Sequence, residues 1–270
     1  MLNYLKLYRF DVFIVTAITA VCGYYLTYGT LSLSVLYLVL FISGILYNYV
    51  YVLNALTDIE ADRINKPERP LPSGKLSYKA VLIYIGLLGL IAILGFIFFF
   101  KGFNRHMVVL VLFIGAVYSI PPIELKKIPI VAPFITGWGL VHPMFITGKF
   151  DIVIFPAVVL TCYSIGTTFL KDLSDIEGDL KEGRKLVTNF LSVKKLLIIS
   201  MIMTSLAALF SLKLRYPIIG LAPFSTFLTT LYFYNFKKES EIKAMVYKKM
   251  ILSVAIVGSI VMTLITTGLV

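Results

Sequence analysis

The sequence predicts an all-α integral membrane protein, and three observations support this fold class. Hydrophobic residues make up 59% of the 270 residues, whereas charged residues make up only 14%. The mean hydropathy is +0.92, far above that of soluble globular domains. The apolar residues also fall into runs, most of them near the roughly 20 residues that a helix needs to cross the hydrocarbon core of a bilayer.

Nine apolar spans follow one another along the chain, and we interpret each as a transmembrane helix. The opening residues MLNYLKLYRF show no separate apolar run with a small-residue cleavage site, so we expect the first span to be retained. The fourth span is short, and the prolines that follow it end a helix. The predicted spans cover residues 10–28, 33–56, 80–100, 106–120, 129–147, 151–170, 194–212, 217–235 and 247–268.

Charged residues divide unevenly between the two sides of the predicted membrane. With nine spans, the N-terminus and every second loop share one side, and 20 of the 25 Lys and Arg residues lie there. Positively charged loops stay in the cytoplasm, so we predict a multi-pass cell-membrane protein whose N-terminus is cytoplasmic and whose C-terminus is outside. The net charge of +11 then reflects orientation in the membrane, and we do not expect nucleic-acid binding.

An acidic pentapeptide occurs twice, as DIEAD at 58–62 and as DIEGD at 175–179. Each copy lies at the cytoplasmic end of an apolar span and opens a polar loop, near 57–79 and 171–194. The separation of 117 residues spans four predicted helices. We therefore predict two pseudo-repeated four-helix halves plus a ninth helix, forming one transmembrane domain over residues 1–270.

Each acidic motif places its polar side chains on one face of a helix. Asn54, Asp58 and Asp62 have i, i+4, i+8 spacing and would stack along a single face, about 6 Å apart in height. Glu60 and Glu177 point roughly away from these faces and are expected to be solvated. The second motif has i, i+3, i+7 spacing at Asp172, Asp175 and Asp179.

If the two helix ends face each other, five carboxylates converge. Each pair at about 6 Å repels by roughly 3 kcal/mol at an effective dielectric near 20, so positive charge must be present. Protonation or lysines could supply it, but hard oxygen ligands on two facing helices suit Mg²⁺, which typically bridges carboxylates to the phosphates of a substrate. The prediction is a site for Mg²⁺ and a diphosphate, and the alternative is ordinary helix-end charge.

Basic and aromatic side chains surround the same region. Lys171 takes the place in the second copy that Asn54 holds in the first. Tyr47 and Tyr51 continue the Asn54 face deeper into the membrane, where their rings could shelter a carbocation, although interfacial tyrosines are common. His142 has no second ligand at metal spacing and indicates a kinked, packed helix. Phosphate could be bound by Arg63, Arg69, Lys126, Lys127 and Lys171, unless these are simply positive-inside anchors.

These motifs resemble the UbiA superfamily of intramembrane prenyltransferases. The resemblance rests on NALTDIEAD, KDLSDIEGD, the loop RINKPERPLPSG, the segment YSIPPIELKK and nine spans with both acidic motifs on one side. It covers nearly the whole chain. The resemblance implies nine transmembrane helices around a central cavity that is capped by polar loops and opens laterally to lipid.

The resemblance also implies roles for individual residues. Asn54, Asp58, Asp62, Asp172, Asp175 and Asp179 would hold Mg²⁺ and diphosphate, and the aspartates at 58, 62, 175 and 179 would be catalytic. Lys171, Arg69 and Lys127 match basic family positions near the diphosphate, and Tyr118 matches the tyrosine of the family's YS-x-P-P segment. Arg63 and Tyr51 are added as substrate-binding candidates from their positions beside the first motif alone. The chain departs from the family at Asp11, where an asparagine is expected, and this departure leaves the roles of Arg9 and Asp11 open.

The implied reaction is Mg²⁺-dependent transfer of a prenyl group from a prenyl diphosphate to a lipid-like acceptor. The loop and the short Ile- and Lys-rich chain are most similar to the archaeal branch, which transfers a geranylgeranyl group to the free hydroxyl of geranylgeranylglyceryl phosphate in ether-lipid biosynthesis. Prenylation of an aromatic acceptor in quinone or chlorophyll-type pathways is the alternative. A cation-coupled transporter is a third, but such sites usually lie near the bilayer midplane.

Overall fold

The structure, a computed structural model, describes residues 2–98, 102–129, 131–147, 149–173, 180–181, 187, 190–214 and 220–237. All regular elements within these residues are helical. They are α1 (Leu2–Leu7), α2 (Phe10–Tyr28), α3 (Leu33–Val39), the π-helix η1 (Leu40–Leu46), α4 (Tyr47–Thr57), α5 (Ile59–Asn65), α6 (Tyr78–Phe98), α7 (Gly102–Ser119), the 3₁₀ turn η2 (Leu125–Lys127), α8 (Val131–Val141), α9 (Pro143–Thr147), α10 (Phe150–Asp172), α12 (Val193–Ser211) and α13 (Leu221–Phe236).

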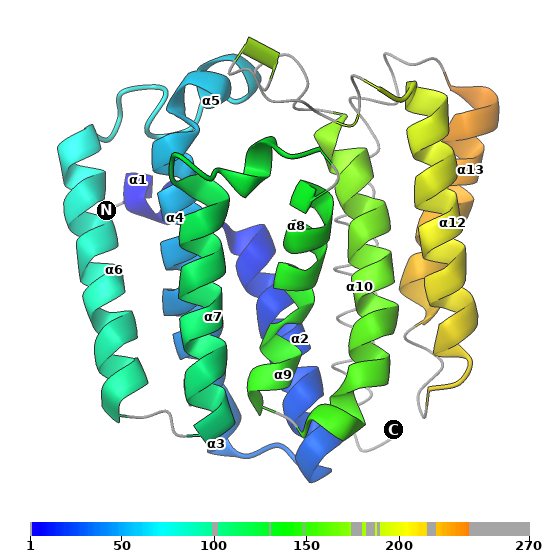
Figure 1. The fold of residues 1–270 in the computed structure, drawn as a ribbon, viewed down its shortest axis with the longest axis horizontal. Helices are drawn as coiled ribbons and strands as arrows, with labels where there is room; N and C mark the ends of the chain where they lie inside the picture. The colour runs from blue at the N-terminus through cyan, green and yellow to red at the C-terminus, as the bar shows by residue number, and fades with distance from the viewer. Residues whose placement is uncertain are drawn as a thin grey trace.

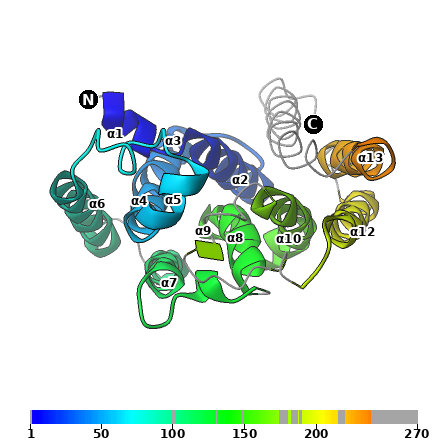
Figure 2. The same cartoon turned by 90° about the horizontal axis from the view of Figure 1, so that it is seen from above.

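The long helices stand side by side (Figure 1). Seen from above, α6 lies at one end of the array and α12 and α13 lie at the other (Figure 2). Between them, α2, α4, α8 and α10 lie near the middle. The C-terminal end of α10 and the short helix α5 are at the same end of the bundle (Figure 1), so the chain enters both acidic loops on one side.

Each of the first eight predicted spans overlaps one or more described helices, and the ninth, 247–268, lies outside the described residues. Four helical segments of the described chain are long and apolar enough to cross a membrane: Leu33–Thr57, Tyr78–Phe98, Phe150–Leu170 and Val193–Ser211. The all-helical class is therefore confirmed. The count of nine, the two repeated halves and the single domain stay predictions.

The distribution of side chains is that of helices in lipid. The outer face of α6 exposes large apolar residues, with Ile83 59% and Leu87 54% accessible. Hydroxyl groups instead lie inside the bundle. The buried Thr204 hydroxyl donates to the Ser200 carbonyl at 2.8 Å, and that of Thr230 donates to the Thr226 carbonyl at 2.8 Å. Because each hydroxyl bonds within its own helix, it can be buried without a partner from another helix.

The break between α8 and α9 follows from Pro143, as the sequence predicted for this stretch. Proline has no N–H, so the carbonyl of Gly139 loses the donor that an unbroken helix would provide. The Tyr47 hydroxyl donates to this carbonyl and also lies 3.3 Å from Nδ1 of His142. His142 is fully buried and packs against Trp138, with ring centres 4.6 Å apart. The histidine therefore packs at a kink, and the kink holds Tyr47 in place.

Close approach of α8 and α10 depends on Gly137. A Cβ atom added there would lie 2.9 Å from the backbone nitrogen and 2.8 Å from Cγ1 of Ile165. The nitrogen belongs to the backbone of α10, so it cannot move aside as a flexible side chain would. Small residues of this kind allow membrane helices to pack closely.

We expect Gly137→Ala to lower the free energy of unfolding by about 1–3 kcal/mol, because the two helices must separate to admit the methyl group. Thermal unfolding in detergent measures this loss. Gly86→Ala is the matched control, since a Cβ atom there would meet nothing within 4 Å. Equal unfolding temperatures for the two variants would show that the α8–α10 contact does not limit stability.

Candidate active site

The first acidic motif lies at a break between α4 and α5. Helix α4 ends at Thr57, Asp58 has φ −108° and ψ 13°, and α5 starts at Ile59. A hydrogen bond of 2.8 Å from the Asp62 N–H to the Asp58 carbonyl spans the break. The expectation that Asn54, Asp58 and Asp62 stack along one uninterrupted helix is therefore wrong. Because the helix is interrupted at Asp58, Asp58 and Asp62 lie on different helical segments and pair with different cations.

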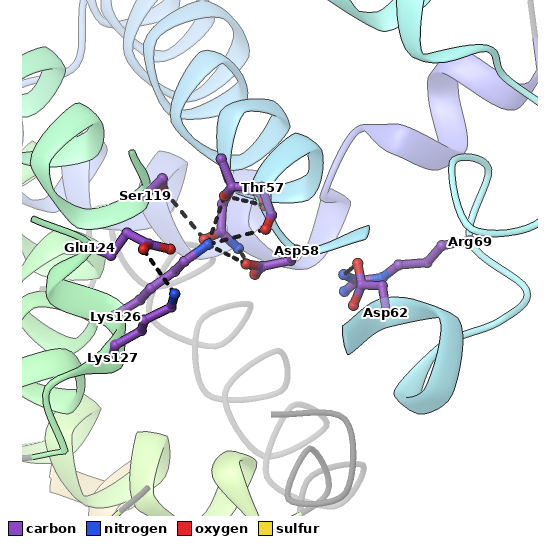
Figure 3. Close-up of polar contacts among 9 residues, drawn as sticks. Thr57, Asp58, Asp62, Arg69, Ser119, Glu124, Lys126 and Lys127 are labelled. Atoms are coloured by element: carbon purple, nitrogen blue, oxygen red, sulfur yellow. Dashed lines mark hydrogen bonds and ion pairs between the residues drawn. The ribbon is translucent and has the colours of Figure 1, made fainter. Parts of the chain in front are cut away.

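Asp58 is buried and is held from two sides. Asn54 Nδ2 donates to Asp58 Oδ2 at 2.7 Å, so the i, i+4 relation from the sequence is confirmed for this pair. Lys126 Nζ lies 2.5 Å from Asp58 Oδ1, and the Lys126 side chain is only 1% exposed. Figure 3 shows Lys126 reaching from its loop to Asp58. The negative charge of Asp58 is thus balanced within the protein interior.

Lys126 has hydrogen-bond partners beyond Asp58. Its Nζ donates to Thr57 Oγ1 at 2.8 Å and approaches the Thr57 carbonyl at 3.5 Å. A buried ammonium group is tolerated only when its protons are bonded, and these contacts meet that condition. The buried Ser119 at the end of α7 donates to Asn54 Oδ1 at 3.4 Å. Residues of α4, α7 and η2 therefore meet at one polar cluster.

The neighbouring Lys127 has a different partner from Lys126. It pairs with Glu124 at 2.8 Å and its side chain is 39% exposed. The family resemblance assigned the diphosphate role to Lys127, whereas the lysine that reaches an acidic motif in the described structure is Lys126. Glu124 and Lys127 are only three residues apart in sequence, so this partly buried pair is a local one. No local signal marked Lys126, because its partner is 68 residues away.

Asp62 forms a second pair, with Arg69 of the polar loop. Arg69 Nη1 lies 2.6 Å from Asp62 Oδ2, and the two side chains are 24% and 7% exposed. Arg63 faces outward and pairs with Glu60 at 2.8 Å, with 58% and 70% of these side chains exposed. Glu60 is therefore solvated, as its spacing predicted. The ion pair described for Arg63 is thus with Glu60, whereas Arg69 is next to the acidic motif (Figure 3).

A cavity of about 710 Å³, its open mouth included, leads from this cluster into the bundle. Asn54 contributes to its wall, as do the rings of Tyr47 and Tyr51, so the predicted continuation of the Asn54 face is confirmed. Arg9, the charged residue among the described lining residues, has its Cζ 5.6 Å from the centre of the Tyr51 ring. The other lining residues are Val50, Val111, Ile114, Gly115, Tyr118, Ile135, Thr136, Trp138 and Gly139.

Tyr118 is at the wall of this cavity, and its hydroxyl lies 3.3 Å from Thr136 Oγ1.

The second acidic motif is described only where its loop begins. Asp175 and Asp179 lie outside the described residues, and only the backbone of Lys171 and Asp172 is described, at the end of α10. Convergence of the two motifs therefore stays a prediction, with both loops entered from the same end of the bundle.

The donors of the first motif fit Mg²⁺ in chemistry. Carboxylate oxygens of Asp58 and Asp62 and the amide oxygen of Asn54 are the hard ligands that Mg²⁺ prefers. Each carboxylate is paired with a cation in the structure, so Mg²⁺ would bind through the remaining carboxylate oxygens or displace Lys126 and Arg69. No group of three or more acidic, histidine or cysteine side chains gathers within the described part of the chain. A complete metal site would need the second motif.

Comparison with known proteins identifies relatives of this arrangement. The UbiA prenyltransferase family matches residues 16–255. Digeranylgeranylglyceryl phosphate synthase of Sulfolobus acidocaldarius is 31% identical over 205 residues, which are 71% of this chain and 68% of that protein. Homogentisate phytyltransferase of Synechocystis is 33% identical over 144 residues, 48% of this chain and 46% of that protein.

Solved structures share the fold over nearly the whole length. One, described as giving insights into digeranylgeranylglyceryl phosphate synthase in membranes, has a TM-score of 0.67 and 26% identity and covers 95% of both chains. Another, a UbiA homolog from Archaeoglobus fulgidus bound to GPP and Mg²⁺, has a TM-score of 0.66 at 17% identity and covers 95% of this chain and 99% of that one.

Proposed function

The chain belongs to the UbiA prenyltransferase family, and on this premise we propose that it transfers a geranylgeranyl group from geranylgeranyl diphosphate to the free hydroxyl of geranylgeranylglyceryl phosphate. The product would be digeranylgeranylglyceryl phosphate, an archaeal ether-lipid precursor. Membership makes the protein a membrane-embedded prenyltransferase. The observation that carries the proposal is a buried, cation-paired Asp58 held by Asn54, which also lines a largely apolar cavity.

The acidic and basic residues act on the diphosphate in this proposal. Asn54, Asp58 and Asp62 would hold Mg²⁺ together with Asp172, Asp175 and Asp179, and the metal would neutralise charge on the leaving group. Lys126 and Arg69, already beside Asp58 and Asp62, would bind oxygens of the diphosphate, with Lys171 contributing from the second motif. Arg63 pairs with Glu60 at the surface and Lys127 pairs with the partly buried Glu124, so both would contribute to binding only after leaving their glutamates.

The carbon–oxygen bond of the allylic diphosphate breaks, and its electron pair leaves with the diphosphate. The acceptor oxygen forms a new bond to the allylic carbon, and its proton passes to the departing diphosphate. The rings of Tyr47, Tyr51 and Tyr118 line the cavity and can stabilise positive charge on the allylic carbon. Apolar residues such as Val50 and Ile114 keep water away, so the acceptor and not water captures the allylic group.

The same premise supports an orientation in the membrane. We propose nine transmembrane helices with the N-terminus and both acidic loops in the cytoplasm and Val270 outside. The prenyl diphosphate would approach the acidic motifs from the cytoplasmic side, and its hydrocarbon chain would lie in the cavity or in membrane lipid. The excess of Lys and Arg in these loops supports this assignment.

The test is a transfer assay with purified protein in detergent. Labelled geranylgeranyl diphosphate and Mg²⁺ are incubated with geranylgeranylglyceryl phosphate or with homogentisate as the aromatic acceptor. We expect label in the diether phosphate and none in the aromatic product. Transfer to homogentisate alone would replace the proposed acceptor with an aromatic one. Ion counterflow in proteoliposomes without any prenyl transfer would instead identify a transporter.

A further inference from the structure

We propose that Gly139 determines which prenyl donors the cavity accepts, because the hydrocarbon chain of the donor fills the room left by its missing side chain. The inference deepens the proposed function and rests on it, since it concerns the prenyl diphosphate of that reaction. Gly139 lies in α8 and is part of the wall of the cavity. No motif in the sequence marked this glycine.

The space beside Gly139 is open. A Cβ atom added there would meet no atom of the described residues within 4 Å. Gly115, also in the wall of the cavity, differs, because a Cβ atom there would lie 2.7 Å from Cγ2 of Val50 on α4. Gly115 therefore allows α7 to pack against α4, whereas packing within the described structure does not require a glycine at position 139. Since glycine is a poorer helix former than alanine, the open space itself is the reason for Gly139.

The open space lies on the cavity side of α8. Gly137, two residues earlier, faces α10, where an added Cβ atom would lie 2.9 Å from the backbone nitrogen of Ile165. Two residues turn an α-helix by about 200°, so Gly139 faces away from α10. Seen from above, α8 lies between α10 on one side and α4 and α7 on the other (Figure 2). Ile135, four residues before Gly139 and on the same face of α8, also lines the cavity.

Gly139 lies deeper in the bundle than the acidic motif. Its carbonyl accepts a hydrogen bond from the Tyr47 hydroxyl, and Tyr47 precedes Asn54 by seven residues in the unbroken helix α4. Seven residues correspond to about 10 Å along the helix axis. Tyr47 and Asn54 both line the cavity, so one cavity extends from the acidic motif to Gly139. A prenyl chain whose diphosphate is bound beside Asn54 and Asp58 therefore passes Gly139 after its first isoprene units.

The length of the prenyl chain decides whether it passes this position. A geranyl group has two isoprene units and a geranylgeranyl group has four, so the longer group extends further from the diphosphate. Apolar side chains of the wall, among them Ile135 and Val111, accommodate hydrocarbon without forming hydrogen bonds to it, so the available space decides which chain fits. A larger side chain at position 139 would exclude long donors and still admit the short one.

The first measurement uses Trp138, the single tryptophan of the chain, which lies in the cavity wall next to Gly139. Quenching of its fluorescence gives the Kd of geranyl, farnesyl and geranylgeranyl diphosphate, with Mg²⁺ and without acceptor, for wild type and Gly139→Leu in detergent. We expect Gly139→Leu to raise the Kd of geranylgeranyl diphosphate by about 10- to 100-fold, as a misfit of a few methylene groups implies. The Kd of geranyl diphosphate should stay within about twofold.

The second measurement is transfer of each labelled donor to geranylgeranylglyceryl phosphate. In Gly139→Leu, kcat/KM should fall most for geranylgeranyl diphosphate and least for geranyl diphosphate. Gly139→Ala adds a single methyl group that the described structure can admit, so this variant should fold and shift the same ratios by a smaller amount. It keeps the proposal testable if Gly139→Leu does not fold.

Gly86→Leu is the matched control. An added Cβ atom at Gly86 also meets nothing within 4 Å in the described structure, but Gly86 lies on the exposed face of α6. This variant should leave the ratio of the Kd values unchanged. Equal changes for the three donors in both Gly139 variants, or no change at all, would overturn the assignment. If the donors are discriminated in binding but wild type transfers no label to the glyceryl phosphate, the proposed function fails and the inference about Gly139 stands.

Discussion

Replacing Asp58 with asparagine is expected to lower the rate of prenyl transfer about 1,000-fold. The substitution preserves the shape of the side chain but removes the charge that faces Lys126 at 2.5 Å. Asparagine keeps an oxygen at this position but carries no negative charge, so the first motif would bind Mg²⁺ more weakly and less positive charge would be gathered on the departing diphosphate. Such a loss of transition-state stabilisation corresponds to roughly 4 kcal/mol.

The measurement is single-turnover transfer of labelled geranylgeranyl groups at saturating acceptor. Glu60→Gln is the matched control, because Glu60 belongs to the same pentapeptide but is solvated and pairs only with Arg63 in the described contacts. It should retain activity within about twofold, as surface substitutions usually do. Asp58→Asn protein must remain monodisperse in detergent. Full activity in such a preparation would remove Asp58 from the mechanism.

Replacing Lys126 with methionine is expected to destabilise the fold by about 3–5 kcal/mol. The Lys126 side chain is 1% exposed, so its removal leaves the Asp58 charge buried without its partner. The Thr57 hydroxyl also loses the ammonium group to which it is bonded at 2.8 Å. Activity should fall as well, because Lys126 would bind the diphosphate in the proposed mechanism.

A double-mutant cycle separates the coupling between Asp58 and Lys126 from the effect of losing the rest of the lysine side chain. Asp58→Asn combined with Lys126→Met removes both charges, and we expect the double variant to recover most of the stability lost by Lys126→Met alone. Chemical unfolding of the four proteins in detergent gives the coupling free energy. Additive losses would mean that the 2.5 Å contact contributes nothing specific to the folded state.

Several local relations could be predicted because they depend on residues close in sequence. The Asn54–Asp58 contact follows from i, i+4 spacing, and it survives although α4 ends just before Asp58. The kink at His142 follows from the missing N–H of Pro143. The outward position of Glu60 follows from its phase relative to Asp58 and Asp62.

Other features depend on packing and had no local signal. The π-helix η1, where the Tyr47 N–H bonds to the Ile42 carbonyl, changes the phase of the helix before the cavity. The sequence predicted an ordinary helix there. Likewise, whether Lys126 or Lys127 pairs with Asp58 depends on how the η2 turn packs against α4. Two adjacent lysines in a sequence give no information about this packing.

The sequence by itself determined the helical class, the positions of the apolar spans and the residue types at the acidic motif. These follow from the transfer of side chains into lipid and from helical periodicity, which act on neighbouring residues. Only the tertiary structure decided that Asp58 faces Lys126 and that Arg9 stacks on Tyr51 at the cavity wall. These contacts join segments that are distant in sequence, and their geometry depends on close helix packing. The contact between Gly137 of α8 and the backbone of α10 is an example of such packing.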